Sequence, residues 1–377
     1  MPLREQTIVD LRKEMMEAVR RGHSIAEVAR MFGVSRPTVY EWLRRYDPDD
    51  PSTLQDRSRA PNERPSKTDV AIEQRLIEER ERWGFGSKKI LARLSETEPD
   101  LSWPHRSTVD GIFKRAGLVR SRRKRRPSSN APFARRYDPS KPGELSTIDF
   151  KGQFRLGDGR YCYPLTMADY VSRYVIVAQA LPSTELAPAW RVIERAFREH
   201  GLPTAMQSDN GPPFGHGNAR LSTMSVRLMK LGVQPIFSRP GKPQDNGVHE
   251  RMHATLKQAA TIPPGKNLRH QQTKLDAFRQ MFNHERPHEA LGMERPARIY
   301  RGSPQAFPTR PPTIEYDSSF EVRRVGHHGE IKWRGTPIFI SHALAGELIA
   351  LETIDYESYQ VHFTNFRIGK LHQGRFI

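Results

Sequence analysis

PGKPQDNGVHERMH, residues 240–253, is the stretch that decides how the middle of the chain is interpreted. Its prolines, glycines and Asn246 are typical of a turn, and the following residues favour a helix over about 244–260. Glu250 lies early in that helix. Two further acids adjoin short apolar segments, Asp149 in Thr147-Ile148-Asp149-Phe150 and Asp209 after Gln207-Ser208. The fold therefore decides whether three carboxylates meet.

The region around these acids, residues 143–300, alternates strands and helices. Apolar patterns predict strands at 145–150, 161–169 and 174–180, joined by turns at 157–159 and 170–173. Further patterns predict a helix at 184–200, a strand at 204–208, a helix at 221–231, a strand at 233–237, and helices at 244–260 and 271–284. Three consecutive strands followed by α/β alternation are typical of a ribonuclease H-like fold.

Carboxylates from two strand ends and one helix can converge on divalent cations. Oxygen ligands suit Mg²⁺ or Mn²⁺ better than zinc. Two such ions about 3.5–4 Å apart can bind the attacking and leaving oxygens of a phosphodiester. We therefore predict Asp149, Asp209 and Glu250 as catalytic and metal-binding residues, with two Mg²⁺ or Mn²⁺ ions. Asp158, in a turn, and Asp169, at the far end of its strand, are the competing candidates for the first aspartate.

The N-terminal residues 1–50 have the pattern of a helix-turn-helix domain. Ile8, Leu11, Met15 and Val19 recur at helical spacing, and Ser24 and Glu27 have capping-box spacing. Gly33 supplies a turn before a third helix from about Ser35 to Tyr46, with Val39 and Leu43 facing the core. That helix would present Arg36, Thr38, Tyr40, Glu41, Arg44 and Arg45 to DNA. The alternative is a three-helix bundle with no DNA role.

The rest of the chain divides by composition. Residues 51–66 are a linker, and 67–119 form a second helix-turn-helix-like domain whose core would include Val70, Leu76, Ile77, Ile90, Leu91, Leu94, Val109, Ile112 and Phe113. Residues 120–142 are a basic linker in which Arg122, Arg123, Lys124, Arg125 and Arg126 would follow DNA phosphates. After a linker at 301–312, six short strand-like segments in 313–377 predict a small β-barrel, for which DNA is the expected partner and protein the alternative.

The overall charge points to a polyanionic partner. The chain has 377 residues, a formal net charge of +18 and a sequence pI of about 10.2, so nucleic acid is the expected partner. Its longest apolar runs fall short of the roughly 20 residues that span a bilayer. A single cysteine, Cys162, excludes an internal disulfide and a cysteine zinc site. We expect a cytoplasmic protein with no membrane partner.

Several segments resemble bacterial insertion-sequence transposases related to retroviral integrases. They are Ser208-Asp209-Asn210-Gly211, residues 240–253, Thr255-Leu256-Lys257 and residues 283–292. The resemblance covers about 140–300 and implies a DDE triad of Asp149, Asp209 and Glu250. It also implies contacts of Lys257, Gln244 and Asn246 with DNA. A homo-oligomer assembled on transposon end repeats and target DNA, at the bacterial nucleoid, is expected by the same resemblance.

The spacing of the triad departs from the family. Forty residues lie between Asp209 and Glu250, and the shorter spacing common in the family would end at Asp245. We choose Glu250 because the Pro-Gln-x-x-Gly-x-x-Glu-Arg pattern around it aligns without a break.

Other functions remain as alternatives. The chain could be a catalytically inactive, transposase-derived repressor, or a ribonuclease H-type nuclease, although a nuclease needs no sequence-reading domain. His249 and His253 have zinc-ligand spacing, but the sequence shows no third ligand nearby. The sequence has no Walker phosphate loop, so we expect no nucleotide cofactor.

Overall fold

The computed structural model describes residues 7–57, 67–119, 137–215, 221–239, 246–310 and 312–377. The chain forms two compact units, residues 1–68 and 69–377, and each is described by itself. Among the described residues, none of the helices is both long enough and apolar enough to cross a membrane.

The first unit is the expected set of three helices. α1 (Ile8–Arg20) and α2 (Ile25–Met31) each begin with a capping box, and α3 (Arg36–Arg45) is capped by the Ser35 side chain. A short 3-10 helix, η1 (Pro51–Leu54), follows. Leu54 is buried in the core of the helices, so this unit continues past residue 50 into the segment expected as a linker.

Part of the predicted core of this unit is wrong. Ile8 and Leu11 are 64% and 41% exposed, whereas Met15 is buried as predicted and Met16 is buried as well. Leu43 is 37% exposed because its neighbour Trp42 fills the core. Trp42 lies between two guanidinium groups, with Arg12 at 3.9 Å and Arg45 at 4.3 Å from its ring centre. One large aromatic ring covered by cations leaves little room for a second apolar residue.

The second helical segment has the core that the sequence predicts, with one exception. α4 (Val70–Trp83), α5 (Ser87–Thr97) and α6 (Arg106–Arg115) pack around a shared apolar cluster. Val70 is 72% exposed, because it is the first residue after the Asp69 cap and lies ahead of the packed turns.

The central region of the chain contains a mixed sheet in the order β4-β3-β1-β5-β6, with β2 also pairing with β3. Its strands are β1 (Leu145–Phe150), β2 (Phe154–Arg155), β3 (Tyr161–Asp169), β4 (Val175–Leu181), β5 (Ala205–Ser208) and β6 (Gln234–Phe237). β1, β3 and β4 are antiparallel, whereas β1, β5 and β6 are parallel. This order confirms the ribonuclease H-like fold.

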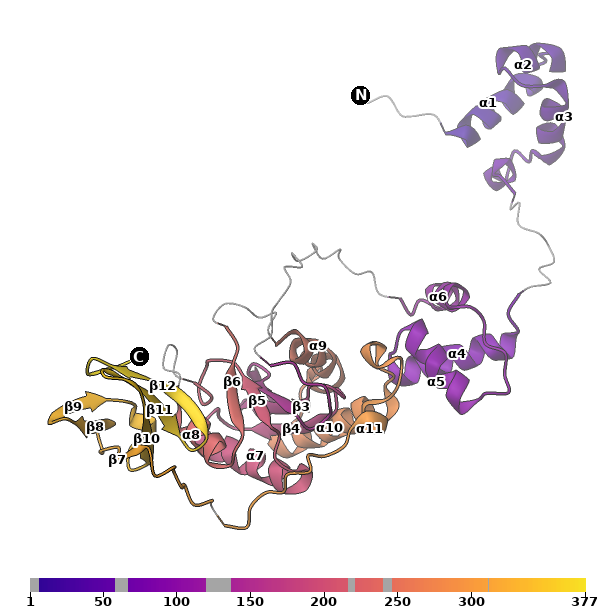
Figure 1. Ribbon diagram of the computed structural model, residues 1–377. Coiled ribbons are helices and arrows are strands. Elements are labelled where there is room, and N and C mark those ends of the chain that lie inside the picture. The colour runs from indigo at the N-terminus through magenta and orange to yellow at the C-terminus, as the bar shows by residue number, and fades with distance from the viewer. Residues whose placement is uncertain (1–6, 58–66, 120–136, 216–220, 240–245, 311) are drawn as a thin grey trace. The chain divides into compact units, whose positions relative to one another are not determined.

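Helices pack against this sheet through two separate apolar clusters, and the ribbon in Figure 1 shows the helices beside it. α7 (Leu186–His200) and α8 (Thr223–Lys230) share one cluster with Ile148 and Met167. α9 (Gly247–Leu256) and α10 (Leu268–Gln280) share another with Val175 and Ala178. Each of the two helices continues into a π-helical turn, η3 (Lys257–Thr261) and η4 (Met281–Glu285), and the short helices η5 (Glu289–Leu291) and α11 (Pro296–Ile299) follow.

The C-terminal region is a small, partly closed β-barrel, the yellow strands of Figure 1. Its sheet has the order β13-β12-β11-β10-β7, beside a β8–β9 hairpin. These strands are β7 (Glu321–Arg324), β8 (Glu330–Trp333), β9 (Thr336–Phe339), β10 (Leu348–Asp355), β11 (Ser358–Phe363), β12 (Phe366–His372) and β13 (Arg375–Phe376), with η6 (His342–Leu344) between β9 and β10. Its apolar core also includes Val226 and Met229 of α8, so barrel and core region pack together.

Candidate active site

The first predicted aspartate, Asp149, lies near the end of β1. The four preceding residues of the strand are buried, and Asp149 is half-buried with a side chain that is 23% exposed. Burial, together with the negative charges of Asp209 and Glu250, raises its pKa to about 7, although the Phe150 backbone N–H and Lys151 oppose the rise. Because both other predicted acids act on Asp149, the fold brings the three carboxylates within electrostatic range.

Two different elements supply the other acids. Asp209 directly follows β5, and since β5 runs parallel to β1, both strands present their carboxyl ends at one edge of the sheet. Asp209 lies at the surface and accepts a 3.2 Å hydrogen bond from the Gly211 N–H. Nearby atoms still displace water from its carboxyl group, which raises its pKa. Glu250 is exposed, in the first turn of α9.

The chemistry of this carboxylate site, Asp149, Asp209 and Glu250, fits divalent cations. Burial, and after it the like charges of Asp209 and Glu250, disfavour ionisation of Asp149 and raise its pKa. A bound cation reverses that penalty, and hard carboxylate oxygens suit Mg²⁺ or Mn²⁺. These three residues would hold the metal.

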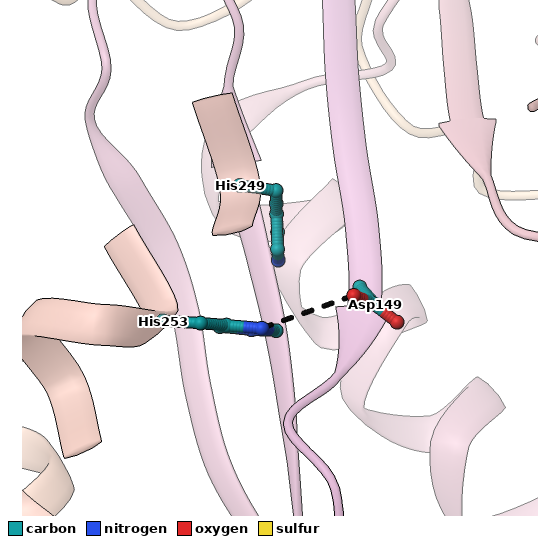
Figure 2. Close-up of side chains that lie close together, drawn as sticks. All are labelled: Asp149, His249 and His253. Atoms are coloured by element: carbon teal, nitrogen blue, oxygen red, sulfur yellow. Dashed lines mark ion pairs between the residues drawn. The ribbon is translucent and has the colours of Figure 1, made fainter. Parts of the chain in front are cut away.

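Two histidines of α9, His249 and His253, lie near Asp149 (Figure 2), and two threonines connect them to the sheet. Thr166 Oγ1 is 2.6 Å from His249 Nε2, 2.7 Å from His253 Nε2 and 3.0 Å from the Asp149 carbonyl oxygen. Thr147 Oγ1 is 2.9 Å from His249 Nδ1. We call these four side chains, His249, His253, Thr147 and Thr166, the histidine network. It connects α9, which carries Glu250, to β1, which carries Asp149, and to the neighbouring strand β3.

Burial keeps both histidines neutral. It lowers the pKa of His253 to about 3, with a further contribution from Lys151, and it lowers the pKa of His249 well below its ordinary value. The expectation that the pair lacks a third metal ligand is wrong, because Asp149 Oδ2 lies 3.8 Å from His253 Nδ1. Helical spacing placed the histidines on one face, but it gave no indication of which strand that face would meet.

The competing aspartates have other partners. Asp169 is fully buried and accepts hydrogen bonds from the Gly143 N–H at 2.8 Å and the Ser172 N–H at 2.7 Å. Asp158 is paired with Arg160 at 2.7 Å in its turn. Gln244 and Asp245 lie outside the described residues.

The predicted DNA-contacting residues of α3 differ in where they point. Arg36, Tyr40 and Arg44 are exposed. Thr38 is half-buried, with its hydroxyl 2.8 Å from the Ser35 hydroxyl at the helix start. Arg45 packs back on its own unit, covering Trp42 and donating a 2.7 Å hydrogen bond to the Gln55 carbonyl oxygen.

The remaining predicted DNA contacts are near the carboxylate site or outside the described residues. Lys257 is exposed at the start of η3. Asn246 is half-buried, directly before α9. Arg122, Arg123, Lys124, Arg125 and Arg126 fall in a range that the structure does not describe.

Sequence reasoning missed a group of cations around His288. The charges of Arg286, Arg173, Lys89 and Arg251 all act on this half-buried histidine, and with burial they lower its pKa to about 4. Arg251 follows Glu250 directly on α9, so the cation group, Lys89, Arg173, Arg251 and Arg286, includes a residue of the helix that carries Glu250. Two members of this environment, Arg286 and His288, lie in the family-like segment 283–292. The other cations come from distant parts of the chain, so the sequence alone could not group them.

Family models match the predicted helix-turn-helix and integrase-core regions. An integrase core domain model matches residues 139–243, and a second one matches 231–296. A helix-turn-helix domain model matches 11–61, and a homeodomain-like domain model matches 38–113.

Among relatives, the chain is 25% identical over 296 residues to the insertion element IS407 uncharacterized 31.7 kDa protein of Burkholderia multivorans, covering 75% of this chain and 93% of that protein. It is 27% identical over 188 residues to the Gag-Pol polyprotein of baboon endogenous virus, covering 49% of this chain but 10% of the polyprotein. Among solved structures, the HTLV-2 integrase catalytic core domain in complex with magnesium is 13% identical, with a TM-score of 0.35, covering 43% of this chain and 98% of that one.

Proposed function

We propose that this chain, which belongs to the integrase-core family of insertion-sequence transposases, is a DNA transposase that cuts the ends of a mobile element and joins them to target DNA. Two observations support the proposal: Asp149 and Asp209 lie toward the same end of the parallel strands β1 and β5, and the charges of Asp209 and Glu250 both act on Asp149. The helix-turn-helix segments ahead of it suit a protein that must find particular DNA ends.

The proposed reaction has two steps of the same kind. Water attacks a phosphodiester at the element end, the P–O bond to the leaving strand breaks, and a 3′-hydroxyl is freed. That hydroxyl then attacks a target phosphodiester, and the 3′-oxygen of the target strand leaves. Two Mg²⁺ or Mn²⁺ ions would supply charge stabilisation for the attacking and leaving oxygens.

The side chains of the protein divide the remaining work. Asp149, Asp209 and Glu250 hold the cations, and the histidine network fixes the helix of Glu250 against the strand of Asp149. The cation group, one member of which, Arg251, follows Glu250 on α9, is proposed to bind DNA phosphates. Lys257, Asn246 and Gln244 are proposed to contact the element end, and Arg36, Tyr40 and Arg44 to contact its repeat sequence.

The complete assembly extends beyond one chain. Because two element ends are joined to one target, we propose a homo-oligomer on DNA, acting at the bacterial nucleoid. Within each chain we propose a DNA-binding domain at 1–50 whose core continues to Leu54, a second at 67–119, a basic linker at 120–142, a catalytic core at 143–300, and a DNA-binding barrel at 313–377.

The test is a cleavage and strand-transfer assay on DNA that carries the inverted repeats flanking the gene, with Mg²⁺ or Mn²⁺, beside a gel-shift on the same DNA. We expect binding, metal-dependent nicking at the 3′ end of the repeat, and joined products. Wild-type protein that binds the repeats but leaves them uncut with either metal would point to the repressor function instead.

A further inference from the structure

The two histidines of α9 lie on the same face of the helix, but they differ in which ring nitrogens have a threonine partner. His249 is fully buried, and both of its ring nitrogens have threonine partners, Thr147 at Nδ1 and Thr166 at Nε2. It therefore has no ring nitrogen left to bind a cation, and its role is to hold α9 on the sheet.

His253 uses only one ring nitrogen in the histidine network. Its Nε2 is 2.7 Å from Thr166 Oγ1, whereas its Nδ1 lies 3.8 Å from Asp149 Oδ2 (Figure 2). That second separation is longer than a hydrogen bond. It is short enough for one cation to bind both atoms, since two ligands each about 2.1 Å from an ion are at most about 4.2 Å apart.

The protons of the network leave the right form of His253 for a metal. The Thr166 hydroxyl donates its proton to the Asp149 carbonyl oxygen at 3.0 Å. Its oxygen is then free to accept the Nε2–H of His253, and the Nδ1 lone pair faces Asp149. A metal-bound histidine typically donates its other ring N–H to a polar partner in this way, which fixes the ring.

We propose that His253 Nδ1 is a nitrogen ligand of the cation held by Asp149, and that this ligand makes the site favour Mn²⁺, Co²⁺ and Zn²⁺ over Mg²⁺. An imidazole nitrogen suits these borderline ions, whereas Mg²⁺ prefers oxygen. The proposal rests on the proposed function, because it takes Asp149 as a metal ligand of the active site. It adds one residue, and a cation preference, that the three carboxylates alone would not give.

The experiment is pulsed electron paramagnetic resonance on Mn²⁺ bound to the full chain, which detects ¹⁴N nuclei coupled to the ion. We expect imidazole coupling in the wild type, loss of it in His253→Gln, and retention in His249→Gln. His249→Gln is the matched control, because it changes the same network on the same helix without removing the proposed ligand. Asp149→Asn identifies which part of the Mn²⁺ signal belongs to this site.

Metal affinities give a second readout that needs no spectroscopy. His253→Gln should weaken Mn²⁺ binding about tenfold or more and Mg²⁺ binding clearly less. Equal weakening of both ions would overturn the proposal in favour of a purely structural histidine.

The outcomes separate this proposal from the proposed function. Mn²⁺ that binds at Asp149 without any ¹⁴N coupling in the wild type removes His253 as a ligand and leaves the transposase proposal standing. If Asp149→Asn removes no bound Mn²⁺, the metal site itself is wrong and both proposals fall.

Discussion

Asp149 and Asp169 lie on neighbouring strands of one sheet, and they differ in what surrounds the carboxylate. Asp169 is fully buried, and its two oxygens accept hydrogen bonds from the Gly143 N–H, the Ser172 N–H and, at 2.5 Å, the Ser172 hydroxyl. Asp149 is half-buried and faces the charges of Asp209 and Glu250. Its pKa is about 7 for that reason.

These different surroundings distinguish a structural acid, Asp169, from a proposed metal-binding acid, Asp149, without any appeal to related proteins. A buried carboxylate supplied with N–H and O–H donors stabilises the fold, because its charge is compensated within the protein. A buried carboxylate that faces other acids destabilises the fold until a cation binds. Substitutions at the two kinds of site should therefore have opposite consequences for stability and for activity.

The largest effect is expected from Glu250→Gln in the carboxylate site. The substitution keeps the size of the side chain and removes one negative charge, so cation binding and stabilisation of the reacting oxygens both weaken. We expect cleavage and strand transfer to fall about 1,000-fold or more, as for the loss of a main electrostatic contact in other active sites. The melting temperature of the metal-free protein should stay unchanged or rise, because a like charge near Asp149 is removed.

Two measurements control this result. DNA binding, followed by gel-shift, should change little or increase, and Lys257→Ala should weaken capture of the element end while metal binding is kept. Normal cleavage by Glu250→Gln would contradict the assignment, and Asp245 would then be the residue to test.

The opposite outcome is expected for Asp169→Asn. The amide carries no charge, and its NH₂ group faces the Ser172 donors that the carboxylate accepts. Losing hydrogen bonds to a buried charged group costs about 1.5–3 kcal/mol, which urea unfolding of the full chain should show. Mn²⁺ affinity at the carboxylate site should be unaffected. Asp158→Asn, in an exposed pair with Arg160, is the matched control and should leave the unfolding midpoint nearly unchanged.

The sequence predicted most elements of the sheet, because their patterns are local. β1 and β3 have the predicted bounds, and the strands before Asp209 and after α8 are present within a residue. Apolar spacing mispredicted burial where a neighbouring residue filled the core. Leu43 was predicted to be buried, but Trp42 occupies that part of the core. Residues joined only by the tertiary fold, such as Thr166 with His253 or Lys89 with Arg286, could not be paired from one sequence.

A smaller effect should separate two adjacent arginines of α3. Arg44 is exposed, so Arg44→Ala should weaken binding to the element end about tenfold, within the range for one DNA contact, and leave the helices stable. Arg45→Ala removes the cover of Trp42 and a hydrogen bond to Gln55, so it should increase hydrogen exchange in α1–α3. Fluorescence anisotropy and hydrogen exchange measure the two effects. Equal losses of DNA affinity in both variants, with no change in exchange, would remove the distinction.

The smallest effect tests whether a buried cation among other cations behaves like Asp149 among other acids. Lys89 is a half-buried cation whose pKa is lowered to about 8 by burial and by Arg286, with Lys88 adding and Glu289 opposing. In the unfolded chain its pKa is near 10.5, so between about pH 8 and 10.5 the unfolded state binds more protons and stability rises with pH. Lys89→Met should abolish that rise and raise the melting temperature slightly at pH 7, where the wild type carries the buried charge.

Bound DNA should stabilise the charged form of Lys89, just as a bound cation is expected to stabilise the charged form of Asp149. A phosphate bound to the cation group would favour the charged lysine and raise its pKa, so DNA binding near pH 8.5 should take up protons. Measuring binding heats in two buffers of different ionisation enthalpy detects that uptake, and Lys89→Met should reduce it. Equal proton uptake in wild type and variant would mean that Lys89 is buried for packing alone. Crowded like charges would then indicate a ligand site at the carboxylates but not at the cation group.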